Sequence, residues 1–253
     1  MGRKITLKTI ILLGVLLCLP TGAWANYVRP NQFMDKKGAE KIIEIKRFQA
    51  QNNLEVTGGL NKKTQEFLYN PKFIVYDVIE KPPTKGNWIV VNKSRRILTM
   101  YRGNQSLGKY PVAVGKSSSL SPSYRGRILN KAISPAWKHI AGGSPANPLG
   151  QRWMGIYVGG KSGYGIHGTI KPHEIGTGAS AGCIRMYNYD IETYVFPKMK
   201  VGDPVWIGTD EELASWGVRQ IIDVAKGEPK PQEKPTPEEP KVEETNAVEV
   251  LKF

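Results

Sequence analysis

Two glycine-rich segments in the second half of the chain contain the residue types that thiol chemistry requires. Residues 165–169 read Gly-Ile-His-Gly-Thr, and residues 179–185 read Ala-Ser-Ala-Gly-Cys-Ile-Arg. A free cysteine has a pKa of about 8.5, but the imidazole of His167 could take the proton of Cys183 and be held as imidazolium beside the sulfur. Gly182 lets a substrate carbonyl approach, and the N–H groups at this turn could stabilise an oxyanion. The pattern predicts acyl transfer.

The N-terminus has the three parts of a secretory signal peptide. Basic side chains lie near the start, residues 10–19 form an apolar run, and residues 23–25 read Ala-Trp-Ala, which signal peptidase accepts. The apolar run is shorter than the roughly 20 residues that span a bilayer. We therefore expect cleavage after Ala25, export to the cell wall or periplasm, and no transmembrane segment after cleavage.

Cleavage would leave Cys183 as the single cysteine of the exported chain, because Cys18 lies in the signal peptide. Such a chain cannot form an internal disulfide, and an unpaired thiol outside the cytoplasm is exposed to oxidants. A lone cysteine can also be a small buried apolar residue. The flanking glycines and the nearby His167 favour a nucleophile.

The chain is strongly basic, with a formal net charge of +14 at pH 7. In a cytoplasmic protein this charge would suggest nucleic acid, but an exported protein meets anionic wall polymers or membrane surfaces instead. The basic residues are scattered and form no stripe. We therefore predict a solvated basic surface and no nucleic-acid partner.

The hydrophobic periodicity changes along the chain from helical to alternating. A helical spacing over 38–48, followed by an Asn61 cap before a second helix, predicts a helical hairpin. Beyond it, a period of two predicts antiparallel strands. The predicted strands lie at 88–90, 97–101, 110–114, 154–158 and 204–207, with further helices at 190–198 and 210–225.

These patterns predict an α+β chain, with a mainly β catalytic domain and a small α-helical N-terminal domain. The final Pro/Glu/Lys-rich segment has too little apolar surface to offset the entropy of ordering, so we expect disorder there. The predicted divisions are a signal peptide at 1–25, a helical domain at 26–72, a linker at 73–85, a catalytic domain at 86–208, a C-terminal helix at 209–226 and a disordered tail at 227–253.

The two glycine-rich segments resemble the signature of the YkuD-type L,D-transpeptidase catalytic domain. In that family, a His-Gly-Thr strand end is followed by Ser/Thr-His-Gly-Cys, a hydrophobic residue and Arg or Asn. Segments at 135–137, 147–150 and 201–205 also resemble the family. The resemblance spans roughly residues 86–208 and implies a β-sandwich-like fold. This chain has Ala181 where the family usually has histidine, so that position cannot act as a base.

The resemblance implies a role for each matching residue. Cys183 would be the acylated nucleophile and His167 its base, with the Gly168 carbonyl orienting the imidazole through its other nitrogen. A guanidinium suits carboxylates, so Arg185 would hold the site or a substrate carboxylate. The remaining implied roles are oxyanion stabilisation by Gly182, support of the loop by Ser180, and lining of the cleft by Tyr164.

The predicted helical hairpin resembles the second half of the peptidoglycan-binding-like domain. The matching residues are the Phe-Gln pair at 48–49 and the turn and helix at 57–68. A hairpin that merely packs on its neighbour explains the same residues, because resemblance in fold does not by itself carry function.

The predicted activity is that of an L,D-transpeptidase acting on peptidoglycan stem peptides, without a cofactor. A tetrapeptide stem would acylate Cys183, release its terminal D-residue and pass to an amine acceptor. Two alternatives stay open: an L,D-carboxypeptidase or wall hydrolase that uses the same site with water, and a non-catalytic wall-binding protein. His173, with His167 and Cys183, lacks the close pairing of known zinc motifs, so we predict no metal. We expect a monomer.

Overall fold

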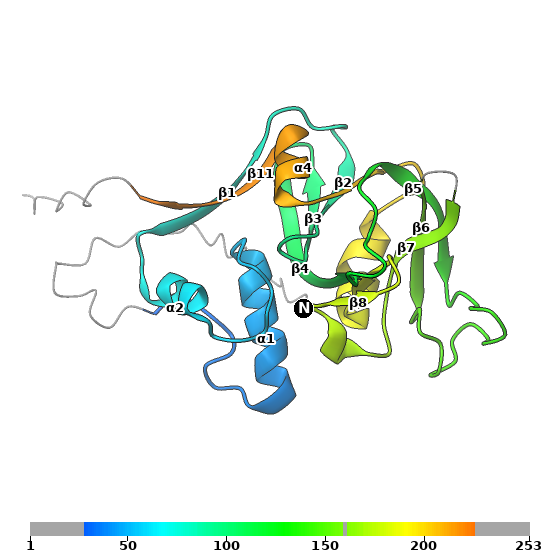
Figure 1. The fold of residues 1–253 in the computed structure, drawn as a ribbon, viewed down its shortest axis with the longest axis horizontal. Coiled ribbons are helices and arrows are strands. Elements are labelled where there is room, and N and C mark those ends of the chain that lie inside the picture. The colour runs from blue at the N-terminus through cyan, green and yellow to red at the C-terminus, as the bar shows by residue number, and fades with distance from the viewer. Residues whose placement is uncertain (1–27, 159–160, 226–253) are drawn as a thin grey trace, which may run out of the picture. The chain divides into compact units, whose positions relative to one another are not determined.

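The computed structural model describes residues 28–158 and 161–225 (Figure 1). The predicted signal peptide at 1–25 and the predicted tail at 227–253 lie outside the described residues, so both stay predictions. Within the part of the chain that is described, no helix combines the length and the apolar character needed to cross a membrane.

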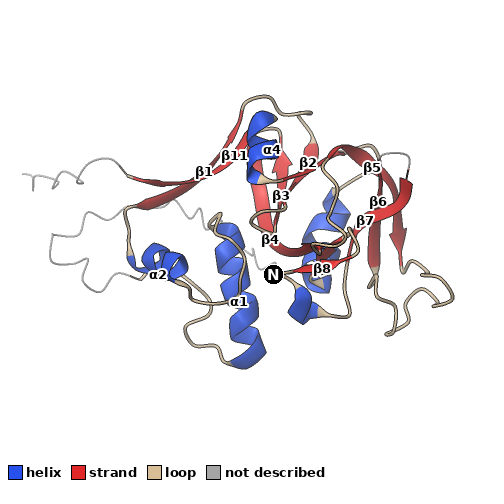
Figure 2. Ribbon diagram, viewed as in Figure 1, coloured by secondary structure: helices blue, strands red, loops and turns tan. Residues whose placement is uncertain are grey.

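Helices are few and short in the described residues, and strands predominate from residue 73 onward (Figure 2). The helical elements are α1 (Gly38–Gln51), α2 (Lys62–Tyr69), η2 (Pro172–Glu174), α3 (Asn188–Asp190), η3 (Ile191–Val195), η4 (Phe196–Lys198) and α4 (Asp210–Ser215). The strands are β1 (Phe73–Ile79), β2 (Asn87–Asn92), β3 (Ile97–Arg102), β4 (Gln105–Gly115), β5 (Tyr124–Ile133), β6 (Arg152–Val158), β7 (Lys161–His167), β8 (Gly178–Ser180), β9 (Ile184–Met186), β10 (Pro204–Gly208) and β11 (Val218–Val224).

Most of these strands form a single sheet. Its order is β3-β2-β10-β5-β6-β7-β9-β4-β8, and β4 also pairs with β3. This second pairing links strands from opposite parts of the series, so the sheet curls around one apolar core. Ile89, Val112, Ile166 and Ile184 are fully buried in it. The mainly β fold predicted for residues 86–208 is confirmed, and the five predicted strands are present as β2, β3, β4, β6 and β10.

Helices α1 and α2 lie where the sequence predicts a helical hairpin, and a separate helical domain at 26–72 stays a prediction. The Asn61 side chain accepts a hydrogen bond from the Thr64 N–H at 2.9 Å, which is the cap that the sequence predicts for α2. The rings of Phe33, Phe48 and Phe67 pack edge to face, with centroids 5.3 and 6.2 Å apart. A binding role for this hairpin stays a prediction.

Two predicted boundaries are wrong. The linker predicted at 73–85 begins with strand β1, and the helix predicted at 209–226 ends at Ser215 and is followed by strand β11. Gly217 has a φ of +79°, a left-handed conformation that typically ends a helix. β11 then pairs antiparallel with β1 from Phe73↔Val224 to Ile79↔Val218. Local periodicity cannot reveal a partner strand so distant in sequence.

Candidate active site

Two neighbouring parallel strands position His167 and Cys183. His167 is the last residue of β7, and Cys183 directly precedes β9. The register places Ile166 opposite Ile184, and both are fully buried in the core. Residues that alternate with these two isoleucines therefore project from the other face of the sheet. If this alternation continues one residue before β9, Cys183 projects from the same face as His167, as its diagonal neighbour.

The imidazole of His167 is buried, and the backbone sets its tautomer. Only 3% of His167 is exposed, and its Nδ1 lies 2.6 Å from the Gly168 carbonyl oxygen. A carbonyl can only accept, so Nδ1 carries the proton and Nε2 is left as a proton acceptor. The indole of Trp153 stacks on the ring, with centroids 5.7 Å apart and planes at 25°. This is the contact expected from the sequence between the ring and Gly168; its role in orienting the imidazole stays a prediction.

The thiol of Cys183 lies against β7. Its Sγ donates to the Gly163 carbonyl oxygen at 3.4 Å. Gly165 follows Gly163 by two residues on β7, and a Cβ added to Gly165 would fall 2.5 Å from the Trp153 indole. Trp153 lies directly opposite His167 in the β6–β7 register, and the absence of a side chain at Gly165 leaves room for its indole over β7.

Asn188 holds the turn that carries the Gly168 carbonyl. Its Oδ1 accepts a hydrogen bond from the Thr169 N–H at 2.7 Å. A Cβ added to Gly168 would lie 2.2 Å from this oxygen, and one added to Gly150 would lie 2.7 Å from it. Both glycines are needed for the amide to fit. Sequence reasoning missed Asn188, because it stands just before the helix predicted at 190–198 and carries no motif of its own.

Ser180 and Gly182 shape the loop that presents the cysteine. The Ser180 hydroxyl donates to the Cys183 carbonyl at 2.5 Å and accepts from the Gly182 N–H at 3.0 Å. The predicted support of the loop by Ser180 is thus seen in its contacts. The Gly182 N–H already donates to the Ser180 hydroxyl, so the oxyanion role expected for it would require that bond to be released; the role stays a prediction.

Ser121 ties the end of β4 to the cysteine loop. Ser121 is only 2% exposed, and its hydroxyl donates to the Gly182 carbonyl at 2.9 Å and accepts from the Gly115 N–H at 2.8 Å. Ser119 adds a bond from its hydroxyl to the Ala181 carbonyl at 3.0 Å. The sequence alone assigns no role to Ser121, because its two partners meet only in the folded chain. A threonine at this position would supply the same hydroxyl.

Burial favours the neutral forms of both reacting groups. It lowers the pKa of His167 to about 4, against the raising effect of the Gly168 bond and with a smaller lowering by Arg185. Burial also raises the pKa of the Cys183 thiol, and a backbone bond to Gly165 and the Arg185 charge oppose it. Burial thus favours a thiol at Cys183 and a neutral imidazole at His167, and opposes the imidazolium and thiolate that the sequence suggested.

The other candidates occupy distinct places. Arg185 lies opposite His167 in the β7–β9 register and pairs with the Glu174 carboxylate. Tyr164 packs on the cysteine loop, since a Cβ on Gly182 would lie 2.6 Å from its ring. His173 is exposed on η2. Among the described residues, no three His, Cys, Asp or Glu side chains are grouped as a metal site would require.

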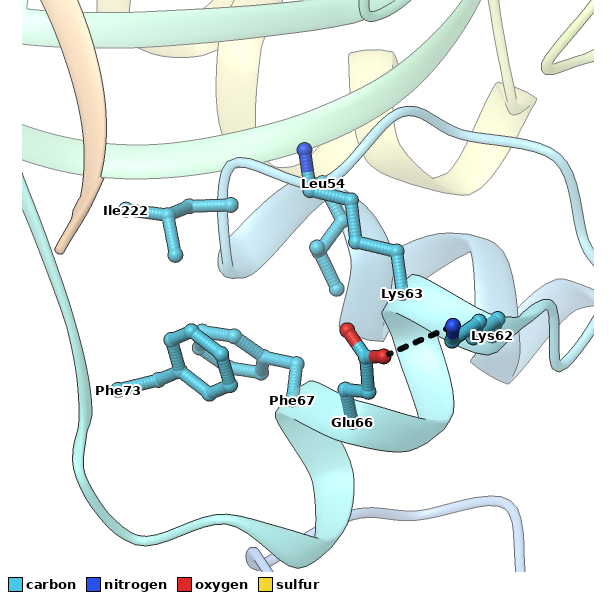
Figure 3. Close-up of a pocket in the computed structure, with 7 residues that line it drawn as sticks. All are labelled: Leu54, Lys62, Lys63, Glu66, Phe67, Phe73 and Ile222. Atoms are coloured by element: carbon cyan, nitrogen blue, oxygen red, sulfur yellow. Dashed lines mark ion pairs between the residues drawn. The ribbon is translucent and has the colours of Figure 1, made fainter. Parts of the chain in front are cut away.

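A separate pocket of about 430 Å³ lies between α2 and the β1–β11 ribbon (Figure 3). Its floor is apolar, and its rim carries the ion pair between Lys62 and Glu66 at 3.9 Å. None of the residues that line it belongs to the cysteine or histidine segments. The lining residues are Leu54, Lys62, Lys63, Glu66, Phe67, Phe73 and Ile222.

Residues 86–207 match the family model of the YkuD domain, described as the L,D-transpeptidase catalytic domain. The chain is 38% identical over 148 residues to "Putative L,D-transpeptidase YqjB" of Bacillus subtilis, a match that covers 55% of this chain and 84% of that protein. It is 34% identical over 131 residues to "Putative L,D-transpeptidase YkuD" of the same organism, covering 52% and 72%. A crystal structure of an L,D-transpeptidase from Xylanimonas cellulosilytica aligns with a TM-score of 0.46 at 16% identity, over 68% of this chain and 81% of that one. Because nearly the whole of the first relative is matched, this chain belongs to the L,D-transpeptidase family.

Proposed function

We propose that this protein is a peptidoglycan L,D-transpeptidase in which Cys183 is the nucleophile and His167 is its base. The observation that supports the proposal is the parallel pairing of β7, which ends at His167, with β9, which begins directly after Cys183. The bond from Nδ1 of His167 to the Gly168 carbonyl supports it, because it leaves Nε2 ready to accept a proton.

The first half-reaction forms a thioester. Nε2 of His167 accepts the thiol proton as Sγ of Cys183 attacks the carbonyl carbon between the third residue and the D-residue of a tetrapeptide stem. The tetrahedral intermediate collapses, the C–N bond breaks, and the imidazolium gives its proton to the departing amine of the D-residue. Both groups start neutral, so the buried site need not hold an ion pair at rest.

The second half-reaction transfers the acyl group. An amine of another stem attacks the thioester carbonyl, and His167 removes the proton of that amine. The C–S bond then breaks, and the sulfur of Cys183 takes its proton back from the imidazolium. One amide bond is broken and one is formed, so the transfer needs no external source of energy.

Neighbouring residues would hold this machinery in place. Ser180 and Ser121 fix the loop around Cys183 through the hydrogen bonds described above. Arg185 opposes the effect of burial on the thiol, and its pairing with Glu174 fits a residue that holds the site. Tyr164 would form one wall of the substrate cleft. A substrate in the cell wall requires export, for which the signal peptide predicted at 1–25 would serve.

Product analysis tests the proposal. Purified protein is incubated with disaccharide-tetrapeptides, and the products are separated by liquid chromatography and mass spectrometry. We expect cross-linked dimers and free D-residue from the wild type and from a variant of the exposed His139, His139→Gln, and neither product from Cys183→Ala. Shortened monomers without dimers would identify water as the acceptor, as in an L,D-carboxypeptidase. Binding to wall sacculi without any product would refute catalysis and favour a wall-binding protein.

A further inference from the structure

Lys46, on α1, is a buried lysine without a carboxylate partner among the described residues. Only 5% of it is exposed, and burial lowers the pKa of its ammonium group. Its Nζ donates instead to the carbonyl oxygens of His173, at 3.3 Å, and of Ile175. A buried ammonium with only carbonyl partners is unfavourable for stability alone, so this contact needs another explanation.

The stem of Lys46 passes between two glycines, close against Gly58 and in van der Waals contact with Gly176. A Cβ added at Gly58 would lie 2.7 Å from Cε of Lys46, and one added at Gly176 would lie 3.4 Å from the same atom. Both glycines have left-handed backbones, with φ of +77° and +87°. The left-handed backbone at Gly58 and its close approach to the Lys46 stem both favour glycine in the turn at 57–59.

The turn that Lys46 holds also carries Glu174. The Glu174 carboxylate pairs with the Arg185 guanidinium, which lies opposite His167 in the β7–β9 register. The packing agrees, because Ile43 of α1 lies against the apolar cluster that includes Ile175. A chain of direct contacts therefore runs from α1 through this turn to the reacting face of the sheet.

Arg47, the next residue of α1, makes a second connection. Its guanidinium donates to Asp190 at 2.8 Å and to Glu44 at 2.8 Å, and the Asp190 side chain is only 3% exposed. Asp190 is the last residue of α3, and Asn188 is the first. Asn188 in turn holds the turn that carries the Gly168 carbonyl.

We propose that Lys46 and Arg47 are positioning residues of the active site. Lys46 fixes the turn that sets Glu174 against Arg185, and Arg47 fixes the helix whose Asn188 sets the carbonyl partner of the imidazole. According to this proposal, the N-terminal hairpin helps to hold the active-site residues in position. The inference rests on the proposed function, because the positioned groups are those of the proposed thiol and imidazole site.

Kinetics with matched variants test the proposal. We expect Lys46→Met and Arg47→Met to lower kcat/KM for dimer formation on the order of 10- to 100-fold, as misplaced catalytic groups do. Lys62→Met, an exposed lysine of the same hairpin, should leave it unchanged, and Arg47→Lys should recover most of the loss because it keeps a cation beside Asp190. Unchanged kcat/KM in folded Lys46→Met and Arg47→Met would overturn the proposal.

A double-mutant cycle separates positioning from general destabilisation. If Lys46 acts through Glu174, the double variant Lys46→Met/Glu174→Gln should lose no more kcat/KM than Glu174→Gln alone. If the losses in kcat/KM of the two single variants multiply in the double variant, Lys46 does not act through Glu174. The same test applies to Arg47→Met in an Asn188→Ala background.

Hydrogen exchange supplies a readout that does not depend on turnover. In Lys46→Met, amides of residues 173–178 should exchange faster while those of β2 and β3 stay as in the wild type. Uniform acceleration, or none, would overturn the inference even if the wild type were active. A wild type that forms no product would refute the proposed function, and the exchange pattern would still decide the contacts proposed here.

Discussion

The buried imidazole of His167 makes stability depend on pH by an amount that follows from its surroundings. Burial lowers its pKa to about 4, whereas a histidine in an unfolded chain titrates near about 6.5. Between these values the unfolded chain binds a proton and the folded chain does not. The stability that the neutral ring contributes is therefore complete above about pH 6.5 and is lost as the pH falls through this interval. The total is about 3 kcal/mol, of which about 2 kcal/mol is lost by about pH 5.

Denaturant unfolding of the wild type and His167→Gln, from neutral pH to about pH 4.5, measures this contribution. The glutamine amide can still donate to the Gly168 carbonyl but does not titrate, so the difference between the two proteins isolates the imidazole from acidic groups. We expect the wild-type advantage to shrink by about 2 kcal/mol between pH 7 and about pH 5. His139→Gln, at an exposed histidine, should track the wild type. Parallel curves for wild type and His167→Gln would refute the reasoning.

Three further outcomes follow from the contacts of the site. Asn188→Ala removes the acceptor for the Thr169 N–H, so steady-state kinetics should show kcat reduced on the order of 10- to 100-fold. Ser121→Ala leaves the Gly115 N–H without its hydroxyl partner and should lower the free energy of unfolding by about 1–3 kcal/mol, whereas Ser121→Thr keeps the hydroxyl and should cost less than about 1 kcal/mol. Iodoacetamide should label Cys183 slowly near neutrality and still accelerate above about pH 8.5, because burial raises the thiol pKa; a plateau near neutrality would contradict this.

The proposed reacting pair, Cys183 and His167, could be predicted from the sequence because two short segments contain the residue types that thiol chemistry requires. A lone cysteine after glycine and a histidine before glycine are informative without knowledge of the fold. The residues that orient the pair are different. Ser121 and Asn188 gain their roles only when β4 and α3 approach the cysteine and histidine loops. Neither residue has a local pattern that separates it from an ordinary turn or helix residue.

The protonation of the pair could not be predicted either. The sequence shows an imidazole near a thiol and so suggests an ion pair, but the depth of burial decides the charge. The Trp153 indole that stacks on the His167 ring comes from β6, and Gly165 leaves room for it because it has no side chain.

The secondary structure of the C-terminal region also could not be predicted from local sequence alone. Residues 218–224 contain enough apolar side chains for either a helix or a strand, and pairing with β1 decides between them. By contrast, the strands from β2 to β4 follow each other closely and alternate clearly, so their pattern alone predicts them.

Intact-protein mass spectrometry after brief incubation with a tetrapeptide stem tests the central claim most directly. The account predicts a wild-type adduct equal to the stem without its terminal D-residue, located on Cys183 by peptide mapping and lost when a stem amine is added. His167→Gln should form the adduct far more slowly, and Cys183→Ala should not form it. An adduct on another residue, or product formation by Cys183→Ala, would contradict the account.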